Sequence, residues 1–490
     1  MKSKFLLVIA IMLTFALVFV ACTPAGGDAP APPADTPAET EDATEDAPAE
    51  AEDAPAETED ATEDAPAETG DGIAGTVRVL LAGFELEDTI DPATGVEREG
   101  LAAFWERTFD PKFPNITTVL TTVGWADAQQ VQQVELASGN VDVLYVGGYG
   151  VQFFEQGLTR ALNDLIDNDP TFDPSIYPQG LWDSNVNMIR SDGTRIGLPA
   201  VMGQRYTMFD TVLFDQWGVE HLSEYPTIDE ILEAAAAMNG INPVTGEENF
   251  GIYFDPAFPL ARFTFDAWSY AFNATGGVGT PERPGEIEWA LDSQEMYDLF
   301  VAYGRLAELA HPGFVTSVGN ERWGTEDNDI AIFLDTNGAG IITDALMTGD
   351  TSLIERFRAV MNVGPNGEGW VAVDPIVMAA NPTYLEASWE VMKHLAGYER
   401  QEWFYLNYLA TPALANPGFL HEIDVYTPVA LAIAQHAQTT LIDSSNPFYV
   451  SDIVPVISSF HTDRSNGIEV DIRAMLEALQ ARAVEWSAAQ

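Results

Sequence analysis

Apolar residues recur with two distinct periods in the part of the chain that follows residue 75. Short runs rich in β-branched residues have the composition of strands, and longer runs with apolar residues three to four positions apart have helical spacing. Their alternation predicts a largely parallel sheet with helices on its faces, whose ligands bind beyond the carboxyl ends of the strands. The strand-like runs are 76–84, 116–123 and 141–149, and the helical runs are 99–114 and 126–139.

The N-terminus has the pattern of an export signal. Lys2 and Lys4 precede an uninterrupted apolar stretch at 5–21, and the only cysteine of the chain, Cys22, follows directly. The small residues before Cys22 resemble the bacterial lipoprotein signal, in which the peptidase cuts before a cysteine that carries diacylglycerol. We therefore predict a signal peptide at 1–21 and a lipid anchor on Cys22; a membrane-spanning anchor and an ordinary core cysteine are the alternatives.

Residues 23–72 lack the apolar surface that folding requires. They consist mainly of Ala, Pro, Thr, Glu and Asp, and the 12-residue segment at 39–50 is repeated at 57–68. Neither copy has an apolar face that stacking could bury, so the repeat does not predict a solenoid. Residues 22–72 are thus predicted to be a lipidated cysteine followed by a disordered acidic tether, rather than an acidic tail that binds a basic partner.

The charge of the chain excludes one class of partner. The formal net charge is −55, of which about −40 belongs to residues 73–490. Nucleic acid binding needs clustered lysine and arginine, so no nucleic acid partner is expected. A cationic ligand would be attracted to such a surface.

Motifs that carry catalysis or bind metals are missing from the sequence. It has no HExxH, GxSxG or P-loop, and 276–285 begins like GxGxxG and then breaks. The six histidines lack metal-ligand spacing, and the acidic loops 167–173 and 326–329 lack the glycine and terminal glutamate of an EF-hand. We predict no cofactor, no metal and no enzymatic activity, although no observation excludes a carboxylate pair of the kind that hydrolyses glycosides.

Seven segments, in the same order, resemble the family 1 extracellular solute-binding proteins, the sugar-type receptors of ABC importers. No single segment is diagnostic, but their common order extends from about Thr76 to the C-terminal helix. The segments are LASGNVDVLYVGG (136–148), FFEQGLTRALNDLI (153–166), DGTRIGLPA (192–200), YTMFDTVLFDQWGV (206–219), PTIDEILEAAAAM (226–238), DIAIFLDTNGA (329–339) and YLEASWEVMKHLAGYERQEWF (384–404).

Three positions depart from the family's pattern. Val141 stands where proline is usual and Asp210 where asparagine is usual, and both changes are compatible with the fold. Ala339 stands where sugar binders of the family commonly place a tryptophan that stacks on a pyranose ring. Because alanine cannot stack, this departure weakens the expectation of a sugar ligand more than that of the fold.

The resemblance implies an α/β, two-lobed periplasmic-binding-protein-like fold of type II, with hinge strands joining the lobes. Lobe one is expected at 73–200 with 370–425, and lobe two at 201–369 with 426–490. In such a fold the ligand lies in the cleft between the lobes, which can be open or closed. The ligand would stabilise the closed state by the difference between its affinities for the closed and open states.

Candidate ligand contacts are aromatic faces that stack on sugar C–H surfaces and planar polar groups that bind hydroxyls. Trp105, Trp389 and Trp403 have core-like helical spacing and are assigned to the interior. The predicted ligand-binding residues are Phe84, Glu85, Trp125, Gly148, Tyr149, Arg205, Tyr206, Trp268, Asp335, Asn337 and Trp370.

These observations together predict a lipid-anchored receptor outside the cytoplasm, at the cell surface or in the periplasm. It would act as a monomer, capture a small solute, preferably a mono- or oligosaccharide, and deliver it to the permease subunits of an ABC importer. A peptide-like or cationic solute is the first alternative, because of the acidity and Ala339. A surface glycoside hydrolase and a wall-associated scaffold are the others.

Overall fold

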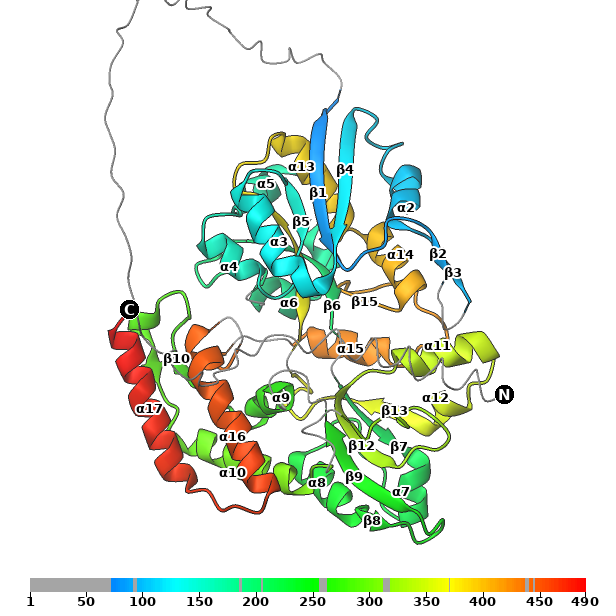
Figure 1. Cartoon of the computed structure of the whole chain (residues 1–490), viewed down its shortest axis with the longest axis vertical. Helices are drawn as coiled ribbons and strands as arrows, with labels where there is room; N and C mark the ends of the chain where they lie inside the picture. Colours follow the sequence, from blue (N-terminus) through cyan, green and yellow to red (C-terminus); the bar gives the residue numbers. More distant parts are fainter. Residues whose placement is uncertain are drawn as a thin grey trace, which may run out of the picture. The chain divides into compact units, whose positions relative to one another are not determined.

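Two sheets, each covered by helices, are built from residues 73–490, which form one compact unit of the chain (Figure 1). The computed structural model describes residues 72–490 except 91–94, 185–186, 204–205, 255–261, 312–317, 370, 437–439 and 444–445. The predicted signal peptide, the anchor at Cys22 and nearly all of the acidic tether lie outside the described residues.

The first sheet has six strands and is mixed. In spatial order they are β15 (Thr411–Pro412), β6 (Leu198–Met202), β14 (Val373–Met378), β5 (Val143–Tyr145), β1 (Gly75–Ala82) and β4 (Ile116–Val123). β1 runs parallel to β4 and β5, as predicted, whereas β14 and β15 are antiparallel to their neighbours. The prediction of a largely parallel sheet therefore holds for β4, β1 and β5. It fails for the rest of the sheet because β14 returns from the second sheet and runs in the opposite direction.

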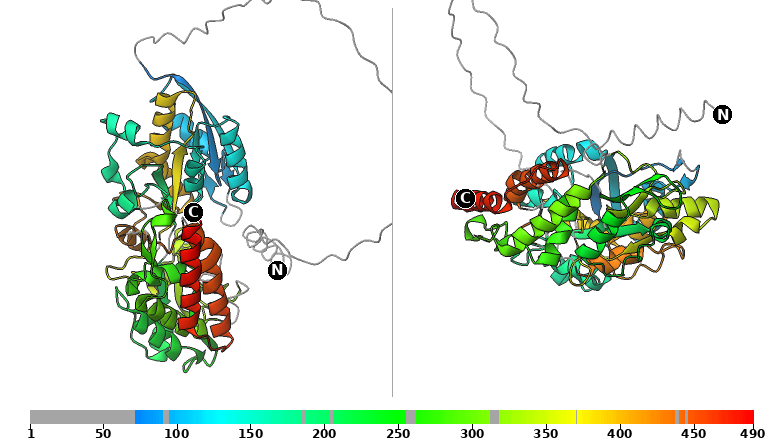
Figure 2. Two further views of the ribbon diagram at one scale, coloured as in Figure 1. Left: turned by 90° about the vertical axis from the view of Figure 1, so that its left-hand side faces the viewer. Right: turned by 90° about the horizontal axis from the view of Figure 1, so that it is seen from below.

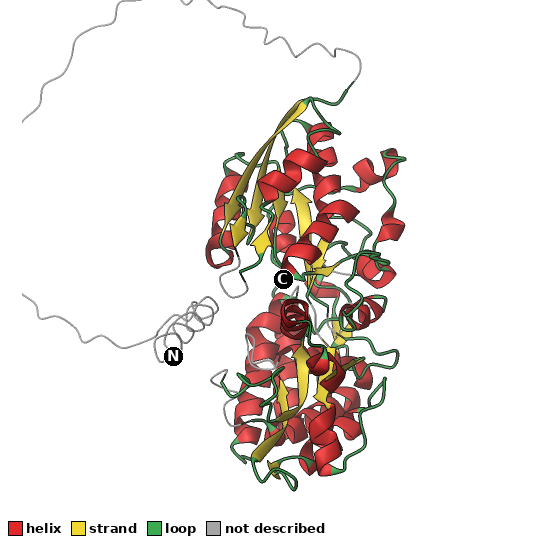
Figure 3. Cartoon of the chain, turned by 90° about the vertical axis from the view of Figure 1, so that its right-hand side faces the viewer, coloured by secondary structure: helices red, strands yellow, loops and turns green. Residues whose placement is uncertain are grey.

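Helices cover both faces of this sheet (Figure 3), and alternate side chains of β1 pack on opposite faces, as the pleat requires. Val79 and Leu81 belong to the buried cluster that includes Phe104 and Trp389, while Leu80 packs with Phe153 on the other face. The first face is covered by α2 (Leu101–Thr108), α13 (Leu385–Ala396) and α14 (Tyr398–Tyr408), and the second by α3 (Trp125–Ala137) and α4 (Gly150–Glu155).

The second sheet has five strands and a larger set of helices. In spatial order its strands are β13 (Phe357–Val360), β7 (Tyr206–Asp210), β12 (Ile330–Thr336), β9 (Glu248–Phe254) and β8 (Gly240–Ile241). Its helices are α7 (Thr211–Trp217), α8 (Ile228–Ala237), α9 (Arg262–Phe272), α10 (Gln294–Leu309), α11 (Ala339–Thr348), α12 (Ser352–Arg356), α16 (Val454–Ser465) and α17 (Ile472–Ala488). The last two lie side by side along this lobe (Figure 2).

The chain passes between the sheets three times. It crosses at 203–205 between β6 and β7, at 361–372 between β13 and β14, and at 413–426 between β15 and the helix α15 (Thr427–Ala434). The first two crossings lie together, since the Gly203 N–H donates to the carbonyl of Ala372 at 2.9 Å. The chain therefore links the two sheets by three separate connections, of which the first two are hydrogen-bonded to each other.

α15 packs against residues of both sheets. Its sequence, TPVALAIA, is apolar almost all round, which is typical of a buried helix. Ala430 and Ile433 belong to a cluster with Tyr206 of the second sheet, whereas Leu431 and Ala434 belong to one with Met202 and other residues of the first. The lobe limits expected from the resemblance stay a prediction, because this helix serves both lobes.

Smaller elements complete the described part of the chain. The predicted helix at 99–114 is shorter in the structure, since α2 ends at Thr108 and is followed by turns, while the predicted helix at 126–139 matches α3 closely. The remaining elements are β2 (Thr89–Ile90), β3 (Glu97–Arg98), β10 (Gly277–Val278), β11 (Glu288–Trp289), α5 (Asn163–Asn168), α6 (Gln179–Ser184), the 3₁₀ turns Pro174–Ile176 and Pro284–Glu286, and the π-helical turn Tyr449–Ile453.

Candidate functional site

An exposed tryptophan stands at the carboxyl ends of the parallel strands of the first sheet. Trp125 begins α3 directly after β4, and 42% of its surface is exposed. Its indole lies against the end of β1, where a Cβ on Gly83 would lie 2.1 Å from the indole nitrogen. Gly83 also has a φ of +72°, so both the backbone conformation and the close approach require glycine there.

Trp125 contacts a tyrosine at the end of β5 that is bonded to a carboxylate. The Trp125 ring packs edge-on against Tyr145 with centroids 5.7 Å apart, and the Tyr145 hydroxyl donates to Asp374 Oδ2 at 3.1 Å. Burial raises the pKa of Asp374 to about 6, and the hydrogen bond from Tyr145 offsets part of that shift. Asp374 lies in β14, so this carboxylate comes from a distant part of the sequence.

Tyr149 is held beside this group by a glutamine of α3. Its hydroxyl donates to Gln132 Oε1 at 2.8 Å, and Gln132 Nε2 donates to the carbonyl of Tyr145 at 2.7 Å. Burial raises the pKa of Tyr149 to about 12, so the phenol stays protonated at physiological pH. The neighbouring Gly148 is exposed.

Three of the sequence-predicted residues are therefore brought together. A Cβ placed on Gly147 would lie 3.0 Å from Tyr149 and 3.4 Å from Trp125, with Gly148 next in the chain. Glu85 is exposed in the loop that follows β1, at the same edge of the sheet. These three residues, together with Glu85, form the candidate site on the first lobe, which we call the Trp125 cluster: Glu85, Trp125, Gly148 and Tyr149.

Phe84 belongs to the core rather than to this surface. It is 5% exposed, its ring lies 4.8 Å from that of Phe404, and it meets the edge of Tyr145 at 5.1 Å. The Phe84 ring, predicted from the sequence to contact a ligand, is therefore covered by other side chains in the structure. The chain turns after Gly83 so that Phe84 points inward and Glu85 outward.

Most predicted residues of the second lobe are also buried. Trp268 is 2% exposed within the main core of that lobe, and Tyr206 is fully buried, with its hydroxyl accepting the Gly338 N–H at 2.7 Å. Asp335 is 4% exposed with a φ of +51°, and Thr264 donates its hydroxyl to the Asp335 carboxylate.

Asn337 is the exposed member of this second-lobe group among the residues that the structure describes. Its Oδ1 accepts the Ala339 N–H at 3.1 Å at the start of α11. Arg205 and Trp370 lie outside the described residues, in the crossings 203–205 and 361–372.

Asp374, Tyr145 and Gln132 are the residues that sequence reasoning missed. A signal for Asp374 does exist, since it is the lone charged residue within the apolar run 371–380. Gln132 has no such signal, because it lies in a helix with several glutamines and only the tertiary structure buries it.

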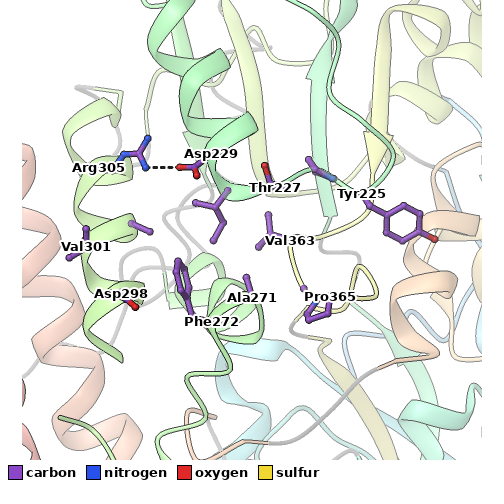
Figure 4. Close-up of a pocket in the computed structure, with 14 residues that line it drawn as sticks. Tyr225, Thr227, Asp229, Ala271, Phe272, Asp298, Val301, Arg305, Val363 and Pro365 are labelled. Atoms are coloured by element: carbon purple, nitrogen blue, oxygen red, sulfur yellow. Dashed lines mark hydrogen bonds and ion pairs between the residues drawn. The ribbon is translucent and has the colours of Figure 1, made fainter. Parts of the chain in front are cut away.

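A separate pocket of about 570 Å³ lies on the second lobe and contains none of the predicted site residues (Figure 4). The ion pair between Arg305 Nη1 and Asp229 Oδ1, 2.8 Å apart, lies at one end, and Phe272 and Val363 line the centre. The pocket therefore does not extend the Trp125 cluster.

Neither a cluster of metal ligands nor a membrane-spanning helix is found among the described residues. Within them, no group of three or more histidine, cysteine, aspartate or glutamate side chains is arranged to hold a metal ion. Among the helices of that part of the chain, none combines the length and the apolar character needed to cross a membrane.

Comparisons with known proteins identify the family and the fold. Residues 94–402 match the family model described as bacterial extracellular solute-binding protein. No curated protein matches the sequence. The sugar-binding protein MalE from Xanthomonas citri is similar in structure, with a TM-score of 0.66 and 15% identity over 85% of this chain and 98% of that one.

Two further solved structures have the same arrangement. An ABC substrate-binding protein from Listeria monocytogenes in complex with cycloalternan has a TM-score of 0.57 and 16% identity, covering 85% of this chain and all of that one. A solute-binding protein from Thermotoga lettingae bound with α-D-tagatose has a TM-score of 0.58 and 16% identity, covering 84% and 100%. These likenesses confirm the two-lobed periplasmic-binding-protein-like fold.

Proposed function

Because the chain belongs to the family of bacterial extracellular solute-binding proteins, we propose that it captures a small carbohydrate between its lobes and delivers it to an ABC importer. Members of this family bind solutes and are not enzymes. The choice of ligand rests on one observation: Trp125 is exposed, lies near Tyr149, and packs against Tyr145, whose hydroxyl binds Asp374.

The chemistry of this group suits a sugar. An indole face packs on the C–H surface of a pyranose, while carboxylate and phenol groups bind its hydroxyls with defined geometry. Above pH 6 the carboxylate of Asp374 is mainly ionised, so it accepts hydrogen bonds from hydroxyls. Three proteins of similar fold support the same ligand class: one is a sugar-binding protein, and the others are in complex with cycloalternan and with α-D-tagatose.

We assign the solute contacts in two groups. The Trp125 cluster, with Asp374 added, forms the first-lobe side of the site, and Asn337 with the start of α11 contributes from the second lobe. Arg205 and Trp370 stay in the proposal because both lie in crossings between the lobes. Phe84, Tyr206, Trp268 and Asp335 support these contacts from the core.

Capture would be coupled to hinge closure. A solute that touches both lobes stabilises the closed arrangement by its differential affinity, and the permease subunits would recognise that arrangement. We further propose that acyl chains on Cys22 hold the monomer at the outer face of the cell membrane and that residues 23–72 act as a tether.

Isothermal titration calorimetry on the purified chain would test the ligand class. We expect micromolar binding of at least one member of a panel of monosaccharides, sugar alcohols and oligosaccharides of two to seven units. Micromolar binding of polyamines or short peptides, with no detectable binding of any sugar, would contradict the proposal. The cationic alternative has a basis in two carboxylates of the first lobe, namely Glu85, exposed in the loop after β1, and Asp374, which accepts the hydroxyl of the Tyr145 ring that Trp125 contacts.

A further inference from the structure

A hairpin of the second lobe reaches the first lobe through a glutamate. Glu282 lies in the loop between β10 and β11, and its Oε1 accepts the Ser191 N–H of the first lobe at 3.2 Å. The same oxygen lies 3.3 Å from Nε of Arg190. The hydroxyls of Ser191 and Thr280 add a contact at 3.4 Å. We call this group the Glu282 contact.

The Glu282 contact is shielded from water. The Arg190 side chain is 8% exposed and that of Glu282 is 20% exposed, and Arg190 Nη2 also binds Glu155 Oε1 at 2.5 Å. By contrast, the pair Arg283–Glu286 in the same hairpin is 59% and 70% exposed. Shielded charges interact more strongly than exposed ones, so the two pairs differ in strength although they are neighbours in sequence.

Each side of the contact is fixed to its own lobe. On the second lobe, Trp289 Nε1 at the end of the hairpin donates to Ser487 Oγ of α17 at 2.6 Å. On the first lobe, the turn at 190–193 is attached to α5, since Asn163 Nδ2 donates to the Gly193 carbonyl at 2.9 Å. A rotation of the lobes about the three crossings would therefore have to stretch or break the Glu282 contact.

We propose that Glu282 is a positioning residue whose contact with Arg190 and Ser191 fixes one relative arrangement of the lobes. The inference rests on the proposed function in one respect, namely that solute binding requires the lobes to move. A contact that forms in just one of the arrangements stabilises that arrangement and shifts the equilibrium toward it. The strength of the contact therefore affects the apparent Kd for the solute. Glu282 acts in this way without touching the solute.

The test compares Glu282→Gln with the matched control Glu286→Gln in the same hairpin. Both variants are made in the full chain carrying Cys22→Ser, with spin labels on Val134→Cys of α3 and Val484→Cys of α17. These two positions are 55% and 52% exposed. Double electron–electron resonance then reports the distance distribution between the lobes, with no solute present.

We expect Glu282→Gln to shift or broaden the interlobe distance distribution and Glu286→Gln to leave it unchanged. Loss of one shielded, charged hydrogen bond corresponds to a change of about tenfold in the equilibrium between arrangements. With any sugar that binds in the calorimetric panel, the apparent Kd should change at least about threefold in Glu282→Gln alone. Identical distance distributions in both variants would overturn the proposal.

The distance measurement separates this inference from the proposed function. A panel in which no sugar binds would contradict the carbohydrate proposal and leave the resonance result valid. Should Glu282→Gln fail to fold, as judged by circular dichroism, Thr280→Ala removes one hydroxyl of the contact and should shift the same distribution in the same direction. An unshifted distribution in a folded Thr280→Ala variant would then count against the contact.

Discussion

The two lobes place their aromatic residues differently, and the difference locates the candidate site. On the first lobe, Trp125 stands at a strand-to-helix junction and is 42% exposed. On the second lobe, Trp268 lies within α9 and Tyr206 within β7, and both are buried. Inside a helix or strand an aromatic side chain packs against the opposing layer. At the carboxyl end of a parallel strand no layer covers it, so there the same residue type is free to bind a ligand.

The largest expected effect concerns the buried tryptophan. Trp268→Ala should lower the free energy of unfolding by about 3–5 kcal/mol, because the change leaves a large cavity in the main core of the second lobe. Urea denaturation followed by circular dichroism measures the change. A loss below about 1 kcal/mol would show that the side chain is not enclosed, and the comparison between the lobes would fail.

A second test addresses the glycine that faces the third crossing. A Cβ on Gly338 would lie 2.0 Å from the ring of Tyr426, whereas one on Gly340 would meet nothing within 4 Å. Gly338→Ala should therefore lower the free energy of unfolding by about 1–3 kcal/mol. Gly340→Ala, in α11, should raise it by about 0.5–1 kcal/mol. Equal effects of the two substitutions in urea denaturation would contradict the close packing at Tyr426.

A third test uses the half-buried carboxylate of Asp374, which accepts the Tyr145 hydroxyl. The pKa of Asp374 is raised to about 6 in the folded chain from 3.8, so the folded state binds this proton more tightly. The stabilisation is present below pH 4 and is lost as the pH rises through 6. Asp374→Asn should remove this pH dependence and gain about 1–2 kcal/mol relative to the parent between pH 4 and 7. Parallel stability profiles of the two proteins would contradict the shift.

The smallest expected change in stability concerns the exposed Trp125, whose substitution should instead weaken sugar binding. Trp125→Ala should alter the free energy of unfolding by less than about 1 kcal/mol but weaken sugar binding by about tenfold or more. The matched control is Val134→Ala on the same helix. The Val134 side chain is 55% exposed and lies about two helical turns away from Trp125. Calorimetric affinities that are equal in the two variants would remove Trp125 from the site.

Much of the candidate site could be predicted, because it lies in loops after strands that the hydrophobic pattern identifies. Trp125, Gly148 and Tyr149 come together since the carboxyl ends of β4 and β5 flank that of β1. Phe84 and Glu85 could not be separated, because a single turn after Gly83 decides which of two adjacent side chains points inward. Residue type alone carries no information about that direction.

The sequence by itself determined the local features of this protein: the alternation of strands and helices, the acidic segment without apolar surface, and the order of segments that identifies the family. The tertiary structure decided which residues meet across long separations. The bond from Tyr145 to Asp374 spans 229 positions, and the bond from Ser191 to Glu282 joins two lobes. Such contacts depend on how the crossings return the chain to the first sheet, and a local hydrophobic period does not encode that path.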